Sequence, residues 1–198
     1  MSRFSPYWIW FALSLPALSM AYDLATSSNP RIYHILVHPS GEYSAILLIL
    51  ALAATPLCLL LKGWRLSTWL KKNRRYIGVA AFAYALLHTV FYLVDKGSPG
   101  VVVRELPRLY IWTGWAAFAI FIPLAVTSTD HFVRRMGPAW KRLQRWTYVA
   151  AVLTLVHWAS LHGWNDPKPA VLYFAPLVLL EAYRVWYWYL RRRPTALA

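Results

Sequence analysis

The sequence predicts an all-α integral membrane protein, a bundle of six transmembrane helices with both termini in the cytoplasm. Of its 198 residues 59% are hydrophobic and only 14% are charged, whereas a soluble domain carries about a quarter charged residues. The charged residues are also unevenly spaced. Five windows of 19 to 21 residues contain none of them: 4–22, 43–61, 76–94, 109–129 and 146–165.

Each window has the length of one membrane crossing, because a hydrocarbon core of roughly 30 Å takes about 20 helical residues. A sixth apolar stretch contains Glu181 and Arg184, which are three residues apart and can pair on one helix face. A membrane β-barrel would need apolar and polar residues to alternate, and these windows are apolar on every face. We therefore expect one domain over residues 1–198, with helices near 6–22, 43–61, 76–94, 109–128, 146–162 and 170–190.

Glycine and proline fall mostly between the windows, where the chain must reverse. These predicted turn residues are Pro30, Pro39, Gly63, Gly97, Pro99, Gly100, Gly137, Pro138, Gly163, Pro167 and Pro169. Four prolines lie inside windows and should kink their helices, which a membrane bundle tolerates: Pro16, Pro56, Pro123 and Pro176. The first window has an alternative interpretation as a cleaved signal peptide, since Arg3 precedes an apolar run that ends in small residues.

The basic residues indicate the orientation in the membrane. With six helices both termini lie on one side, and that side, with segments 62–75 and 130–145, carries 16 of the 21 Lys and Arg residues. By the positive-inside rule this side faces the cytoplasm. The net charge of +14 is then explained by topology and by contact with anionic lipid, and no nucleic-acid-binding motif accompanies it.

Two of the six histidines, His88 and His157, lie well inside windows. Both predicted helices run outward from the cytoplasm. His88 stands seven residues before Asp95 and His157 nine before Asp166, which places both roughly 10–14 Å from the outer end. An imidazole at membrane depth is costly unless its nitrogens have partners. The two side chains are therefore candidate ligands of one cofactor.

Several interpretations of this histidine pair remain open. Each ring could simply bond a neighbouring hydroxyl, for instance Thr89 or Thr154, and hold helices together. Axial ligation of a heme iron by both imidazoles is the alternative that we favour, because it needs no further protein ligand. Zinc or copper would need additional ligands at that depth. Paired carboxylates, an activated nucleophile and a phosphate-binding glycine loop are all missing from the sequence, so electron transfer is a better prediction than hydrolysis or phosphoryl transfer.

Residues around the two histidines resemble the YedZ/MsrQ family, the heme-binding membrane subunits of the periplasmic protein-methionine-sulfoxide reductase system, within the ferric-reductase-like transmembrane group. The resemblance covers roughly residues 38–160. Its spacing is carried by His38, Ser40-Gly41, Thr55-Pro56, Arg74, Arg75, Gly78, Phe82, His88, Thr127-Ser128-Thr129, Arg134, Gly137, Trp140, Leu143, Tyr148 and His157.

This resemblance implies that His88 and His157 ligate heme b. Electrons would pass from a cytoplasmic flavin reductase or the quinone pool to a periplasmic molybdopterin reductase, and that partner would reduce methionine sulfoxide. The chain would thus be an electron-transfer subunit of an oxidoreductase system and not a stand-alone enzyme. Basic residues at the cytoplasmic helix ends could bind heme propionates or a flavin phosphate: Arg74, Arg75, Arg142 and Arg145.

One position departs from the family pattern. Thirteen residues before His157, where the family usually has a histidine, this chain has Gln144, and an amide is a poor iron ligand. We therefore expect either a single heme, or one heme together with a different inner cofactor such as FMN or a quinone. The alternative is two hemes, with His131 as a substitute for the missing ligand. Two further functions remain open, a membrane ferric reductase and a heme-free scaffold or assembly protein.

Overall fold

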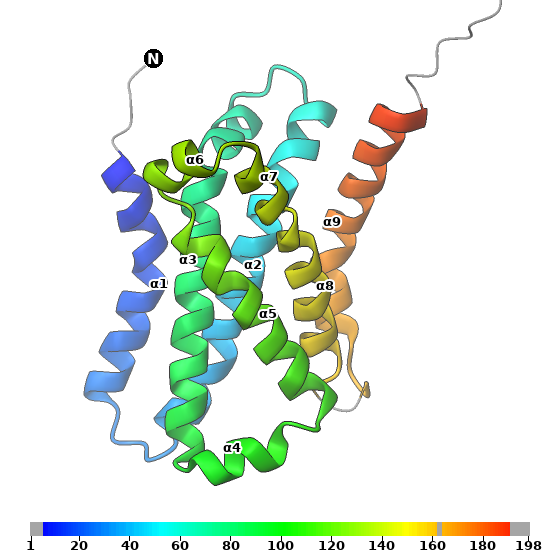
Figure 1. The fold of residues 1–198 in the computed structure, drawn as a ribbon. Helices are drawn as coiled ribbons and strands as arrows, with labels where there is room; N and C mark the ends of the chain where they lie inside the picture. The colour runs from blue at the N-terminus through cyan, green and yellow to red at the C-terminus, as the bar shows by residue number, and fades with distance from the viewer. Residues whose placement is uncertain (1–5, 162–163, 191–198) are drawn as a thin grey trace, which may run out of the picture.

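Every regular element is helical in the part of the chain that the computed structural model describes, residues 6–161 and 164–190 (Figure 1). This confirms the predicted all-α class. The elements are α1 (Pro6–Thr26), α2 (Ile32–Leu60), α3 (Arg65–Lys96), α4 (Pro99–Glu105), α5 (Leu109–Val126), α6 (Asp130–Met136), α7 (Pro138–Gln144), α8 (Trp146–Ala159), α9 (Lys168–Val185) and the π-helical turn η1 (Trp186–Leu190).

Five of these helices are long and apolar enough to cross a membrane: α1, α2, α3, α5, and α9 continued through η1. The sixth predicted span, 146–162, corresponds to α8, which has 14 residues and a length of about 21 Å. That is shorter than the roughly 30 Å of a hydrocarbon core. By helix length and composition the chain is a multi-pass membrane protein with five such spans in its described residues.

Helices α2 and α3 are longer than the apolar windows indicated. α2 begins at Ile32 and not near residue 43, so Pro39 lies inside a helix and its assignment to a turn was wrong. α3 begins at Arg65 and not near residue 76, and its 32 residues extend about 48 Å. The physical reason is that a charged residue ends an apolar window without ending a helix, whose backbone groups bond one another in water or lipid.

Most of the segment 130–145, expected as a loop, forms the short helices α6 and α7. The Oγ1 atom of Thr129 accepts a hydrogen bond from the backbone of Phe132 at the start of α6. Gly137 ends that helix with a φ of 51°, a conformation that favours glycine, and Pro138 begins α7. Figure 1 shows α6 and α7 at the end of the bundle where α1 begins and α9 with η1 finishes.

Small buried residues let the central helices pack closely, as is usual in membrane bundles. Ala54, Ala81 and Ala150 have at most 1% of their surface exposed. Helix α1 is attached to α3 by Tyr84, whose hydroxyl donates to the carbonyl of Leu13 and accepts from the backbone N–H of Ala17. The Tyr84 hydroxyl thus stands between the N–H of Ala17 and the carbonyl of Leu13, two groups that would bond each other in a regular helix, just after the internal proline of α1.

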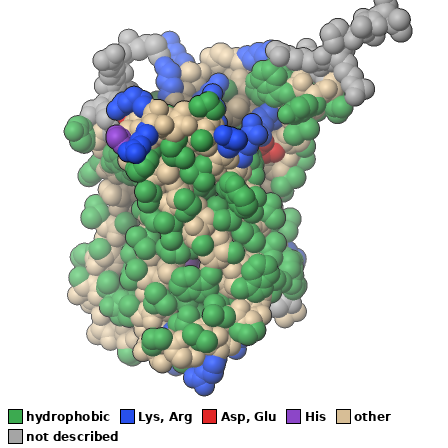
Figure 2. All heavy atoms as spheres, viewed as in Figure 1, with side chains coloured by type: hydrophobic (Ala, Val, Ile, Leu, Met, Phe, Trp, Pro, Cys, Tyr) green, Lys and Arg blue, Asp and Glu red, His purple; other side chains and the backbone are tan. Residues whose placement is uncertain are grey.

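Large apolar side chains face outward along the middle of the bundle. Leu172 and Leu179 on α9 are 74% and 71% exposed. Figure 2 shows a broad apolar band on the visible face, with Lys and Arg gathered mainly at the end formed by α6 and α7. An apolar band with one strongly basic end is the surface expected of a protein that sits in lipid.

Candidate functional site

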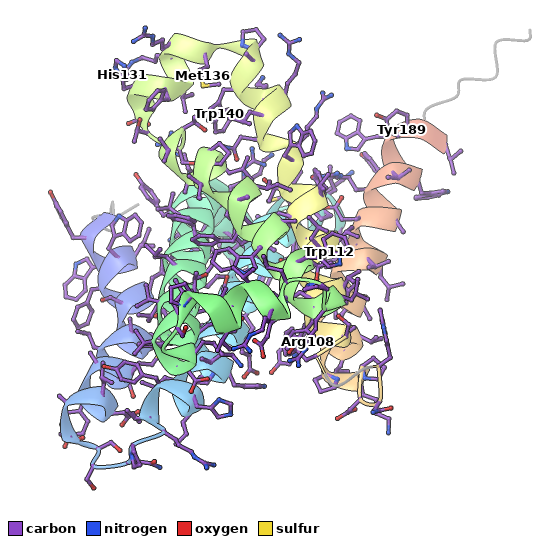
Figure 3. The ribbon with its side chains drawn as sticks, turned by 60° about the horizontal axis from the view of Figure 1, so that its bottom comes forward. Arg108, Trp112, His131, Met136, Trp140 and Tyr189 are labelled. Atoms are coloured by element: carbon purple, nitrogen blue, oxygen red, sulfur yellow. The ribbon has the colours of Figure 1, made fainter. Side chains whose placement is uncertain are left out.

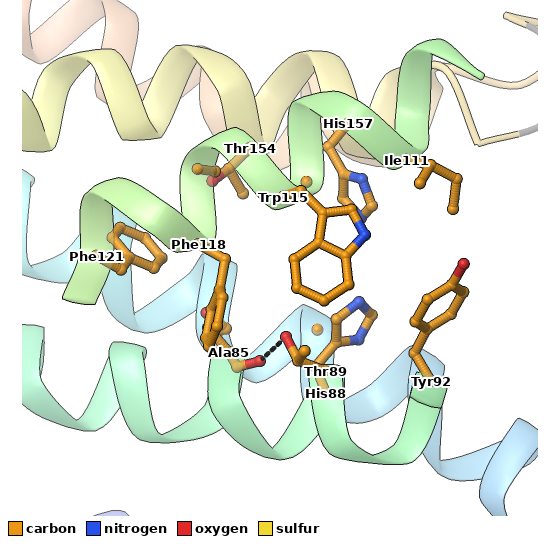
Figure 4. Close-up of a pocket in the computed structure, with 14 residues that line it drawn as sticks. Ala85, His88, Thr89, Tyr92, Ile111, Trp115, Phe118, Phe121, Thr154 and His157 are labelled. Atoms are coloured by element: carbon orange, nitrogen blue, oxygen red, sulfur yellow. Dashed lines mark hydrogen bonds between the residues drawn. The ribbon is translucent and has the colours of Figure 1, made fainter. Parts of the chain in front are cut away.

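The structure brings the two predicted site residues together. His88 comes from α3 and His157 from α8, and their ring centres are 6.1 Å apart with the ring planes at 87° to each other. The two rings face one cavity (Figure 4). Two metal–nitrogen bonds of about 2 Å each, plus roughly 1 Å from each nitrogen to its ring centre, add up to about 6 Å. The spacing therefore fits two imidazoles bound to one metal ion from opposite sides.

Both histidines are held through Nδ1 by a main-chain carbonyl of a neighbouring helix. Nδ1 of His88 lies 2.8 Å from the carbonyl oxygen of Val37 on α2. His157 makes the same contact with the carbonyl of Tyr110 on α5. A carbonyl only accepts hydrogen bonds, so each Nδ1 carries a proton and donates it. In the neutral ring Nε2 then keeps its lone pair, which is the state that a metal-ligating imidazole requires.

Each imidazole packs against a glycine of the neighbouring helix. A Cβ atom added to Gly41 would lie 2.8 Å from Nδ1 of His88, and one added to Gly114 would lie 2.7 Å from Nδ1 of His157. Both distances are shorter than van der Waals contact allows. Any larger residue would therefore have to displace the imidazole that it faces.

The cavity beside the rings is mainly apolar and aromatic. Its lining includes Tyr92, Trp115, Phe118 and Phe121 (Figure 4). At about 100 Å³ it is smaller than the roughly 300 Å³ of ordinary cofactor sites, so a macrocycle would require aromatic side chains such as Trp115 to turn aside. The donor set and its spacing fit a planar, axially ligated cofactor. An apolar lining also keeps water away from it.

The alternative in which the histidines bond nearby hydroxyls is wrong for this structure. The hydroxyls of Thr89 and Thr154 donate to carbonyls of their own helices, those of Ala85 and Ala150, at 2.8 Å. A threonine inside a helix satisfies its hydroxyl in this way at little cost. The imidazoles bond main-chain carbonyls of other helices instead.

A charged cluster closes the end of this cavity that is remote from α6 and α7. The hydroxyl of Tyr92, which lines the cavity, donates to Glu105 at 3.0 Å. Glu105 also accepts bonds from Lys96 at 3.2 Å and from Arg108 at 2.9 Å. Burial raises the pKa of the Glu105 carboxyl, but the bonds from Lys96 and Tyr92 and the two positive charges outweigh it. Its pKa therefore lies below the ordinary value.

A second, larger cavity of about 290 Å³ lies toward the basic end of the bundle. Phe121 lines both cavities, so they adjoin at this ring. Three of the four basic residues predicted near a cofactor line the second cavity, Arg74, Arg75 and Arg145, and Arg142 is not among the lining residues. The prediction for Arg142 does not fit the geometry, because its neighbour Lys141 lines the cavity instead.

Gln144, at the position of the missing family histidine, lines this second cavity. Its Nε2 donates to the carbonyl of Leu124 on α5 at 3.2 Å. Tyr148, one helical turn later, also lines the cavity, and its hydroxyl accepts a bond from Arg184 at 2.7 Å. The second cavity therefore combines positive charge, an amide and aromatic rings.

The other histidines lie apart from these cavities. His131 is on α6 with its ring against Phe132, at the opposite end of the molecule from Arg108 (Figure 3), and it lines neither cavity. His34 contacts Asp95 and His38 contacts Glu42, both at the surface. His162 lies outside the described residues. Among the residues that the structure describes, no three His, Cys, Asp or Glu side chains form a metal-binding group.

Sequence comparison places this geometry in a known family. The model of the family "Ferric reductase like transmembrane component" matches residues 40–155, which include His88 and both glycines and end two residues before His157. Among curated proteins, the protein-methionine-sulfoxide reductase heme-binding subunit MsrQ of Ralstonia nicotianae is 34% identical, covering 96% of this chain and 88% of that protein. The MsrQ of Caulobacter vibrioides is 36% identical over 90% and 85% of the two chains.

The chain belongs to the MsrQ family. The MsrQ protein of Rhodospirillum rubrum, 38% identical over 73% of this chain, gives the same assignment. No solved structure matches the chain. The resemblance predicted from the sequence is thereby confirmed, and the MsrQ relatives align with nearly the whole bundle, first and last helices included.

Sequence reasoning missed the main-chain partners of the histidines. Val37, Tyr110 and Gly114 were not predicted as site residues, and Gly41 was named only for its place in the MsrQ pattern. A signal does exist in retrospect. The dipeptides Ser40-Gly41 and Thr113-Gly114 each place a hydroxyl and a missing side chain in an otherwise apolar helix.

Proposed function

We propose that this chain is the heme b-binding subunit of a methionine sulfoxide reductase system in a bacterial inner membrane. The observation that carries the proposal is the facing pair His88 and His157, each held by Nδ1 with Nε2 left for a metal. The MsrQ relatives are named as heme-binding subunits, which favours heme over other metal cofactors. When bound, heme supplies a site that accepts and gives one electron at a time.

The residues of the chain have defined tasks in this function. The carbonyls of Val37 and Tyr110 hold both imidazoles in the tautomer that binds metal. Two imidazoles would fill both axial positions, which favours electron transfer over oxygen binding. The aromatic lining, including Trp115 and Phe118, keeps the site dry and its dielectric constant low.

We propose one heme, at the histidine pair, and FMN or a quinone in the second cavity. Gln144 supports this, since its side-chain nitrogen donates to the carbonyl of Leu124 and an amide is a weak iron ligand. Arg74, Arg75 and Arg145 supply the charge that a flavin phosphate would need. A cofactor there would lie next to the heme site across Phe121, on the path from a cytoplasmic donor.

We further propose six membrane spans with both termini in the cytoplasm. α7 and α8 follow one another almost without interruption, and together they cover residues 138–159, about 33 Å at the helical rise. The turn at Arg145 would then lie at the cytoplasmic edge of this crossing, where the basic residues of α7 reach the lipid headgroups. Helix α1 begins, and α9 with η1 finishes, at the basic end of the bundle (Figures 1 and 2). The positive-inside rule assigns this end to the cytoplasm.

The electron donor would be a cytoplasmic flavin reductase or the quinone pool, and the acceptor a periplasmic molybdopterin-dependent reductase. The test uses the purified chain in proteoliposomes, with its heme reduced chemically and followed at its visible bands. Reoxidation should require both the partner reductase and methionine sulfoxide, with the partner alone as control. Rapid reoxidation by ferric chelates without any partner would contradict this acceptor and support a ferric reductase.

A further inference from the structure

The two halves of the histidine site repeat one local arrangement on different helices. In each half an imidazole reaches across to a neighbouring helix and bonds a carbonyl. The residue four positions after that carbonyl is a glycine: Val37 precedes Gly41, and Tyr110 precedes Gly114. A helical side chain covers the turn before its own Cα. Each glycine therefore uncovers the carbonyl that the histidine uses.

A hydroxyl residue precedes each glycine and stabilises the same turn. Ser40 Oγ lies 2.7 Å from the carbonyl of Leu36 and 2.9 Å from that of Val37. Thr113 Oγ1 lies 2.7 Å from the carbonyl of Leu109 and 3.3 Å from that of Tyr110. Ser40 and Thr113 are both completely buried. Each glycine with its buried hydroxyl neighbour thus forms a notch in its helix, and the imidazole that packs there bonds the carbonyl of Val37 or Tyr110.

The consequence is a fixed angle between the two rings. Each ring plane is set by its own notch, and the two planes lie at 87°. When axial imidazoles on a low-spin ferric iron are parallel, both donate to the same iron d orbital and separate it in energy from its partner. When they are perpendicular, each donates to a different orbital and the two orbitals stay close in energy. The g tensor then becomes strongly anisotropic.

We propose that Gly41 and Gly114 are positioning residues that hold the planes of His88 and His157 perpendicular across the cofactor. The inference rests on the proposed heme binding. It adds that the glycines, through the carbonyls that they uncover, set the electronic structure of the iron. An added Cβ would lie 2.8 Å or 2.7 Å from the respective Nδ1. The ring must then leave its carbonyl and turn.

The experiment is electron paramagnetic resonance at liquid-helium temperature on the detergent-purified ferric protein. Wild type should give one broad, strongly anisotropic low-spin signal with a large maximal g value. Gly41→Ala and Gly114→Ala should each retain heme but lose most of that signal, in favour of a rhombic three-line low-spin spectrum or a high-spin signal. Gly100→Ala is the control. It also lies in a helix, its added Cβ would make only ordinary contact at 3.7 Å, and its spectrum should match wild type.

The outcomes distinguish a failure of this inference from a failure of the proposed function on which it rests. Wild-type protein without heme overturns the proposed function and the inference with it. Wild-type protein with a rhombic low-spin signal leaves heme binding intact and overturns the perpendicular arrangement. Unchanged spectra in both alanine variants overturn the role of the glycines. If an alanine variant does not fold, the wild-type signal still decides the ring geometry, and the remaining variant decides the glycine role.

Discussion

The hydroxyl of Tyr92 donates a hydrogen bond to the carboxylate of Glu105, 3.0 Å away, and so connects the lining of the histidine cavity to a charged cluster at the end of the bundle. Glu105 is 12% exposed and pairs with Lys96 and Arg108. The carboxylate is thus the shared partner of three groups, two on α3 and one in the segment between α4 and α5. The negative charge of Glu105 therefore stabilises the contacts among these groups at this end of the cavity.

This cluster predicts a pH dependence of stability. The folded-state pKa of Glu105 lies below its unfolded value, so its stabilising effect is full above the unfolded pKa of about 4.3 and is lost as pH falls through the folded pKa. Glu105→Gln should lower the stability at pH 7 by roughly 1–3 kcal/mol, the cost of losing a charged hydrogen bond. Thermal unfolding followed by tryptophan fluorescence should show the difference from wild type shrinking below about pH 4. A difference that stayed constant from pH 7 to 3 would contradict the assignment.

Gln144 predicts the heme content of the second cavity. Gln144→His restores an iron ligand where the side chain now only donates to Leu124, and should raise heme from about one toward two per polypeptide. The pyridine hemochrome assay measures this directly. Gln144→Leu, similar in size and without donors, should remain near one. Unchanged heme in the histidine variant would mean that the second cavity cannot accept a macrocycle.

Arginine in the second cavity predicts how a flavin would bind. Arg145→Ala removes one charged donor from the lining and should weaken FMN binding about 10- to 100-fold, since a charge-assisted bond contributes roughly 1.5–3 kcal/mol. Quenching of flavin fluorescence on titration measures the affinity. Arg142→Ala is the matched control, because Arg142 is one turn away and does not line the cavity. Equal affinities in both variants would point to an uncharged occupant such as a quinone.

The sequence predicted the features that depend on one property of the residues, such as the absence of charge from a membrane-spanning helix. Windows without charge located the helices because burying charge in lipid is costly, and counting from the outer acidic residues put His88 and His157 at similar depth. The same windows did not predict where α2 and α3 begin. Both helices extend beyond their apolar sections, so that α2 includes Pro39 and α3 starts at Arg65.

The details of the site depend on how one helix lies against another, and a single sequence does not contain that information. Thr89 and Thr154 are near the histidines in sequence, yet their hydroxyls bond their own helices. The actual partners, Val37 and Tyr110, are 51 and 47 residues away from the histidines that they hold. Only the packing of α2 on α3 and of α5 on α8 brings them into contact.

The central claim, that His88 and His157 together bind one heme, is tested most directly by heme per polypeptide in purified wild type, His88→Ala, His157→Ala and His131→Ala. Wild type and His131→Ala should hold about one low-spin b-type heme, and the other two variants close to none, because bis-imidazole ligation needs both rings. Absence of heme from wild type, or equal heme in all four proteins, would contradict the account.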